Sequence, residues 1–258
     1  MNANGPGLSP SPAEQPTNEI SNTLYLHYLK MMRQPQGLSI AIIAGMQGIV
    51  NGLRLESVHI QPKEDYNMTN EHTCVCFTGR RPKDLFGYKS HTAYMPLRAR
   101  IEEAVETFID TEGVDTFISG GAQGVDQLAF WAVENVKKRR PGIRNVVYVP
   151  FRGQERRWKE DGPFSQSEYR LMLRRADDIR YVGELNADES NVSRLLLGRN
   201  VAMIEDSLAV ISVFPETADP RVSRGGTAHA IRCAVERDIP VYNIDPLTLS
   251  GTFPAFGR

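Results

Sequence analysis

Short runs rich in β-branched and other apolar residues alternate with longer helical segments through the chain after Met68. The runs predict six strands of four to seven residues, at 74–78, 116–119, 145–150, 179–182, 208–214 and 240–244. The intervening segments repeat apolar residues at spacings of three and four, which predicts five helices, at 93–111, 125–139, 165–175, 194–207 and 227–238. This alternation predicts a doubly wound α/β domain, with a mainly parallel sheet and helices on both of its faces.

The chain before Met68 has a different character. Its first 67 residues carry nine charged side chains, against 52 in the remaining 191 residues. Residues 2–18 are rich in Pro, Ser, Gly and Asn, which cannot bury enough apolar surface to offset the entropy lost on ordering. Met68 itself looks like a natural start of translation. Residues 1–67 are therefore expected to be a disordered N-terminal extension or a wrongly assigned upstream start, followed by the domain at 68–250 and a short tail at 251–258.

An uncharged stretch at 37–53 resembles a weak signal anchor. It is shorter than the roughly 20 apolar residues that a membrane-spanning helix needs. Four glycines also dilute its apolar character. We therefore expect no membrane partner.

The charge and the cysteine content of the chain indicate which binding partners and which cellular compartment to expect. Thirty Lys and Arg balance 31 Asp and Glu, so the chain lacks the excess of positive charge that nonspecific nucleic-acid binders carry. The three cysteines are Cys74, Cys76 and Cys233, an odd number that fits a reducing cytoplasm. A Cys-x-Cys zinc site would need further ligands, and only His72 and His229 are of a suitable type. We expect a cytoplasmic protein with no metal site.

A first candidate binding loop follows the first strand, with the sequence Thr78-Gly79-Arg80-Arg81-Pro82. Glycine allows the backbone to turn sharply, and two guanidinium groups at the exit of the strand suit phosphate oxygens. A solvated turn with surface arginines would have the same pattern. This loop therefore indicates a phosphate clamp only in combination with others.

A second loop joins a strand directly to a helix through Ser119-Gly120-Gly121-Ala122-Gln123-Gly124-Val125-Asp126. Small residues let the main chain approach a ligand closely, and free amides at a helix start favour an anion. Asp126 lies in the first turn of the helix. It is expected either to stabilise the helix dipole or to accept a hydrogen bond from a sugar hydroxyl.

A third loop, Ser223-Arg224-Gly225-Gly226-Thr227, again precedes a helix. Its hydroxyl groups and amides can form a second anion cradle, although Ser223 or Thr227 could equally serve as a helix cap. In parallel sheets, ligands bind at the carboxyl ends of the strands. The presence of two Gly-Gly loops at equivalent strand ends therefore favours ligand binding by these loops.

Five segments taken together resemble the SLOG superfamily, which joins the DprA and LOG families: TGRRP, SGGAQGVDQLAFWAV, VPFRGQERRW, RNVAMIEDS and RGGT. Their order and spacing are most similar to the YpsA-like branch, over residues 73 to 245. The resemblance implies a Rossmann-like fold with a nucleotide pocket formed by the three glycine loops. It also nominates as pocket neighbours Arg80, Ser119, Gly120, Asp126, Gln154, Trp158, Arg199 and Asn200. Trp158 could stack on a base or pack in the core, and Gln154 could read a base edge.

The resemblance leaves three functions open. LOG proteins cleave the N-glycosidic bond of nucleoside monophosphates with a glutamate just after the Gly-Gly-Thr turn, but here the nearest carboxylate after Thr227 is Glu236. DprA proteins bind single-stranded DNA, for which the balanced charge of this chain is unsuited. We favour a sensor or sequestering module that binds a nucleotide or a nucleotide-derived ligand, because no nucleophile, metal cluster or paired carboxylates occur at a compelling spacing. No cofactor is expected, turnover stays undecided, and a homodimer is expected by analogy with other Rossmann-like domains.

Overall fold

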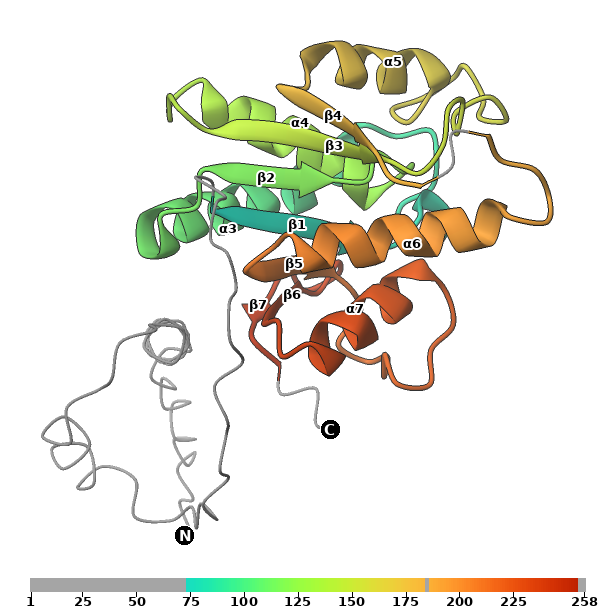
Figure 1. Ribbon diagram of the computed structural model, residues 1–258. Coiled ribbons are helices and arrows are strands. Elements are labelled where there is room, and N and C mark those ends of the chain that lie inside the picture. The colour runs from blue at the N-terminus through green and yellow to red at the C-terminus, as the bar shows by residue number, and fades with distance from the viewer. Residues whose placement is uncertain (1–72, 184–185, 255–258) are drawn as a thin grey trace, which may run out of the picture. The chain divides into compact units, whose positions relative to one another are not determined.

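The computed structural model describes residues 73–183 and 186–254. These form a seven-stranded sheet with helices on both faces, coloured from blue-green to red along the chain in Figure 1. The expectations for residues 1–67, for the uncharged stretch at 37–53 and for the last four residues of the tail lie outside the described residues. Within the described residues, no helix is long and apolar enough to cross a membrane.

The sheet has the strand order β4-β3-β2-β1-β5-β6-β7. All neighbouring strands are parallel except β6 and β7. The strands are β1 (Cys74–Gly79), β2 (Thr116–Ser119), β3 (Arg144–Val149), β4 (Asp178–Tyr181), β5 (Ala209–Val213), β6 (Val241–Ile244) and β7 (Gly251–Thr252). The strand order reverses at β1, which pairs with β2 on one side and with β5 on the other. The expected doubly wound, mainly parallel α/β fold is confirmed.

The strand β7 occupies the first two residues of the segment that the sequence predicts as a tail. Gly251 and Thr252 pair with Ile244 and Asn243 of β6 in the antiparallel direction. Arg100 supports this edge, because its Nε donates a 3.0 Å hydrogen bond to the carbonyl oxygen of Leu249. A two-residue strand has too little alternation to be recognised in a sequence.

Helices cover the sheet on both faces (Figure 1). They are α3 (Met95–Glu112), α4 (Val125–Lys137), α5 (Gln166–Arg175), α6 (Val192–Glu205) and α7 (Gly226–Glu236), with the short 3-10 helices η1 (Pro82–Asp84) and η2 (Thr92–Tyr94) between β1 and α3. Alternate residues of β3 pack on opposite sides. Val147 joins the core with residues of α4 and α5, whereas Val146 joins the core with residues of α6 and α7. This period of two is why a buried parallel strand is apolar throughout.

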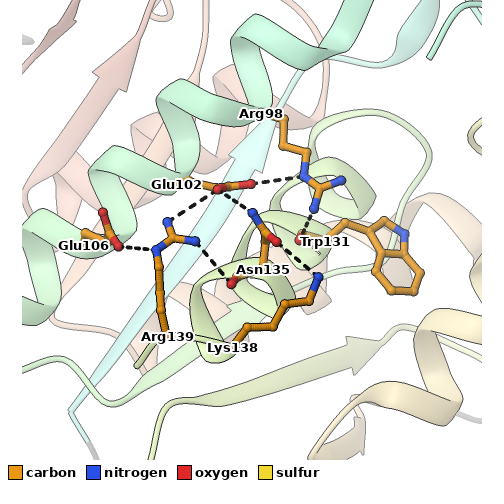
Figure 2. Close-up of polar contacts among 7 residues, drawn as sticks. All are labelled: Arg98, Glu102, Glu106, Trp131, Asn135, Lys138 and Arg139. Carbon is orange, nitrogen blue, oxygen red and sulfur yellow. Dashed lines mark hydrogen bonds and ion pairs between the residues drawn. The ribbon is translucent and has the colours of Figure 1, made fainter. Parts of the chain in front are cut away.

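A polar network joins α3 to α4 along their exposed sides (Figure 2). Glu102 accepts hydrogen bonds from Arg98 (3.2 Å), Asn135 (2.8 Å) and Arg139 (3.5 Å). Arg139 also binds Glu106 at 2.7 Å. These contacts hold the C-terminal end of α4 against α3.

Candidate functional site

A cavity of about 710 Å³ lies at the carboxyl end of β1, where the strand order reverses. Ligands in open α/β sheets bind at this kind of position. Its walls come from the loop after β1, the start of α4, one side of α6, and the segment that leads into α7. Figure 1 shows α6 and α7 side by side on the same face of the sheet, and these two helices pack together.

The structure brings ten of the predicted site residues to this cavity. They come from all three glycine loops and from α6: Thr78, Gly79, Arg81, Ala122, Asp126, Arg199, Asn200, Gly225, Gly226 and Thr227. Seven others are not among its lining residues: Arg80, Ser119, Gly120, Gly121, Gly124, Gln154 and Trp158. The three loops therefore meet in space, but their residues do not all have the same role.

Two of the glycines that do not line the cavity pack against protein groups. A Cβ atom at Gly120 would overlap the guanidinium group of Arg199. Gly124 has a φ of 100°, and a Cβ there would lie 2.6 Å from the carbonyl oxygen of Arg80. In this structure, the absence of a side chain at these positions allows close packing around the site.

The two adjacent arginines after β1 separate. The Arg80 guanidinium lies over the ring of Phe214, with its Cζ 4.4 Å from the ring centroid, and its Nε is buried without a hydrogen-bond partner among the described residues. Arg81 lines the cavity, and no described acidic side chain pairs with it. Of these two adjacent arginines, Arg81 is therefore the one that is available to bind an anion in the cavity.

Gln154 and Trp158 are held by Tyr169. Gln154 Nε2 donates to the Tyr169 hydroxyl at 2.7 Å, and the Trp158 and Tyr169 rings meet edge to face with centroids 5.2 Å apart. Trp158 packs against the core cluster formed with α4 and α5. Of the two roles considered for Trp158, this geometry matches core packing.

A buried ion pair lies at the base of the cavity. Arg199 Nη1 is 3.3 Å from Asp126 Oδ2, and both side chains are at least 90% buried. The Ala122 amide donates to the same carboxylate at 3.2 Å. Burial lowers the pKa of Arg199, and the Asp126 carboxylate opposes this shift. Asp126 Oδ2 is thus engaged by two protein groups.

The same arginine connects the second glycine loop to the third. Arg199 Nε donates to Asn200 Oδ1 at 2.9 Å, and Asn200 Nδ2 donates to the Gly226 carbonyl oxygen at 3.4 Å. A continuous polar chain therefore runs from the start of α4, across α6, to the start of α7. It holds the two helix N-termini in a fixed relation.

The N-terminus of α7 has free amides at the cavity. Its N-cap residue is Gly225, with a φ of 108°, and no side chain caps the helix. No acidic residue lies in its first turn. In contrast, the N-cap of α5 is Ser165, whose hydroxyl accepts from the Glu168 amide. The uncapped end of α7 is a suitable position for an anion, because its amides and its dipole both favour negative charge.

Several lining residues were not predicted as site residues. Ser193, Leu196 and Leu197 of α6 line the cavity together with Arg221, Val222 and Arg232. Ser193, Leu196 and Asn200 are spaced three and four residues apart, so helical periodicity from Asn200 could have identified this side of α6. The loop residues give no comparable signal in the sequence.

His229 also lines the cavity, near Cys233 on the same helix. Its Nδ1 is 3.6 Å from the Cys233 sulfur. Burial and the nearby Arg232 lower the pKa of His229, while burial raises the pKa of the Cys233 thiol. The neutral forms of both groups are therefore favoured. Within the described part of the chain, no group of three or more His, Cys, Asp or Glu residues could hold a metal ion.

Comparisons with known proteins place this chain in a family. The uncharacterized SPbeta prophage-derived protein YoqJ from Bacillus subtilis is 33% identical over 149 residues, covering 54% of this chain and 81% of that protein. A UPF0398 protein from Bacillus cereus is 26% identical over 143 residues, covering 55% of this chain and 74% of that protein.

Among solved structures, DNA processing protein A from Helicobacter pylori, described with its single-stranded DNA binding mode, is similar over 68% of this chain and 70% of that chain. The sequence identity is 17% and the TM-score is 0.40. The chain matches the model of the YspA SLOG family over residues 75–249. The resemblance to SLOG proteins is confirmed, and this chain belongs to the YspA SLOG family.

Proposed function

We propose that the protein binds a nucleotide or a nucleotide-derived phosphorylated ligand in this cavity, and that it acts as a sensor or sequestering module. The observation that carries the proposal is the uncapped N-terminus of α7, which opens into the cavity beside Arg81 and Arg224. No described acidic side chain pairs with either arginine. Free helix amides and two unpaired guanidinium groups favour a phosphate.

The charge of the cavity supports an anionic ligand. Its lining includes five arginines, Arg81, Arg199, Arg221, Arg224 and Arg232, and Asp126 is the one acidic residue among the described lining residues. The Asp126 charge is balanced by Arg199, and Arg221 is balanced by Asp219 outside the lining. A net positive cavity attracts a charged ligand from solution and orients it.

The state of the ionisable groups favours binding without turnover. Cleavage of an N-glycosidic bond needs a carboxylate that can approach the sugar. Asp126 is instead held by Arg199 and by the Ala122 amide. Burial raises the pKa of Cys74 to about 11, that of Cys76 to about 12, and also that of Cys233, so the thiol forms are favoured over thiolate nucleophiles. The odd number of cysteines in the chain also supports a reducing, cytoplasmic setting.

Titration calorimetry of the full chain with AMP, GMP, CMP and UMP, and with their diphosphates, tests the proposal. We expect saturable binding of at least one nucleotide. Arg81→Ala and Arg224→Ala should each weaken that binding by about ten- to a hundredfold, since a charge-assisted hydrogen bond contributes about 1.5–3 kcal/mol. Arg140→Ala is the matched control, because Arg140 is an exposed arginine that pairs with Asp110 and does not line the cavity.

Two other outcomes would replace the proposal. Chromatographic detection of a free base released from a bound nucleotide, abolished by Asp126→Asn, would identify a hydrolase. Absence of nucleotide binding, together with oligonucleotide binding that weakens steeply with salt, would identify a single-stranded DNA binder.

A further inference from the structure

The lining of the cavity combines two chemically different kinds of group. The start of α7 and the arginines provide amides and positive charge. Leu196 and Leu197 of α6, together with Val222 of the loop before α7, contribute aliphatic side chains. A phosphate would bind to the amides and the arginines. The aliphatic side chains therefore fit an apolar part of the same ligand.

Val222 is held in an exposed position by the turn around it. Its side chain is 80% exposed, although it is a large aliphatic residue. The Ser223 amide donates to the Asp219 carbonyl oxygen at 3.0 Å, and the Arg221 amide donates to Asp219 Oδ1 at 2.8 Å. These bonds close a tight turn that carries Val222.

Arg232 fixes this turn to α7. Its Nη1 donates to the Pro220 carbonyl oxygen and, at 3.0 Å, to the Ser223 carbonyl oxygen. These two acceptors lie on either side of Val222 along the chain. The position of Val222 is therefore set before a ligand arrives, which reduces the entropy cost of binding.

No Phe, Tyr or Trp is among the described residues that line the cavity, and His229 is the one lining residue with an aromatic ring. Both tryptophans of the chain, Trp131 and Trp158, are outside the lining. The large apolar side chains that the lining offers to a base are therefore aliphatic. Resting on the proposed function, we propose that Leu196, Leu197 and Val222 form an aliphatic seat for a nucleobase. The ligand is then a nucleoside phosphate, and not a sugar phosphate or inorganic phosphate.

The seat predicts a preference that can be measured. Contact with aliphatic side chains removes apolar surface of the base from water, and burial of about 60 Å² at about 25 cal/mol per Å² corresponds to roughly a tenfold gain in affinity. A ligand with the same phosphate and sugar but no base lacks this gain. Ribose 5-phosphate provides that comparison.

The experiment compares ribose 5-phosphate with the four nucleoside 5′-monophosphates by titration calorimetry on the full chain. We expect the wild-type protein to bind the best nucleotide at least about tenfold more tightly than ribose 5-phosphate. Val222→Ser should reduce this ratio by about fivefold and leave the affinity for ribose 5-phosphate unchanged. Leu247→Ser is the matched control, because Leu247 is 79% exposed and does not line the cavity.

Two results would contradict the proposed aliphatic seat for the nucleobase while leaving the proposal of phosphate binding intact. One is equal wild-type affinity for ribose 5-phosphate and for every nucleotide. The other is a Val222→Ser variant that weakens both classes of ligand by the same factor. If neither class binds to the wild-type protein, the proposed function itself fails, and the seat fails with it. Circular dichroism of Val222→Ser checks folding, which the exposure of Val222 should leave unaffected.

Discussion

The guanidinium group of Arg199 and the carboxylate of Asp126 form a buried ion pair, with Arg199 Nη1 3.3 Å from Asp126 Oδ2. The two residues are 73 positions apart in the sequence. Their pairing joins α6 to the start of α4 beneath the cavity. The consequences of this contact can be tested by measuring stability.

We expect Arg199→Met to lower the free energy of unfolding by about 3–5 kcal/mol, because it leaves a buried carboxylate without its counter-charge. Asp126→Asn should also destabilise the protein, since Arg199 would then lack a partner. The double variant should lose less unfolding free energy than the sum of the losses in the two single variants. Urea denaturation of all four proteins measures this coupling. Additive losses would show that the pair contributes no interaction of its own.

Gly120 and Gly198 provide a matched pair of glycine substitutions. A Cβ at Gly120 would overlap the Arg199 guanidinium, whereas a Cβ at Gly198 in α6 would have no atom within 4 Å. Gly120→Ala should destabilise the protein by about 1–3 kcal/mol through overpacking and should weaken ligand binding. Gly198→Ala should stabilise it by about 0.5–1 kcal/mol through helix propensity and leave binding unchanged. Equal effects of the two substitutions would contradict this view of Gly120.

The fluorescence of Trp158 should not change when the ligand binds. Its ring packs on Tyr169, outside the cavity, so a bound nucleotide has no contact with it. We expect intrinsic fluorescence of a Trp131→Phe variant, in which Trp158 is the remaining tryptophan, to stay constant during a titration that calorimetry shows to be saturating. Trp158→Phe should retain the affinity within about a factor of two. Strong quenching on binding would instead place a base against Trp158.

His229 should make stability depend on pH. Burial and the charge of Arg232 lower its pKa in the folded protein below the ordinary value of 6.5. Between the folded pKa and 6.5, the unfolded chain therefore binds more protons than the folded chain. Stability rises with pH through this window, and it falls as the pH is lowered below 6.5. The His229→Gln variant should have a shallower slope of unfolding free energy against pH between about 5 and 7. An unchanged slope would assign the effect to other groups.

The sequence alone was sufficient to predict most of the fold. The six strands and five helices were predicted from local apolar periodicity, and the structure places them within a few residues of the expected positions. Periodicity is effective here because each buried strand and each amphipathic helix shows its burial pattern in its own residues. The glycine loops are recognisable from their place beside these elements, because the first two directly follow a predicted strand and the third directly precedes a predicted helix.

Only the tertiary structure decided which residues of those loops reach the cavity. Arg80 and Arg81 are adjacent and chemically identical, yet Arg80 lies over Phe214 while Arg81 lines the cavity. Gly120 was predicted to approach a ligand, but a side chain there would collide with Arg199 of a distant helix. The contribution of Leu196, Leu197 and Val222 depends on α6 and the loop before α7 lying on the same cavity. Such contacts join residues far apart in the chain, so no local pattern of the sequence records them.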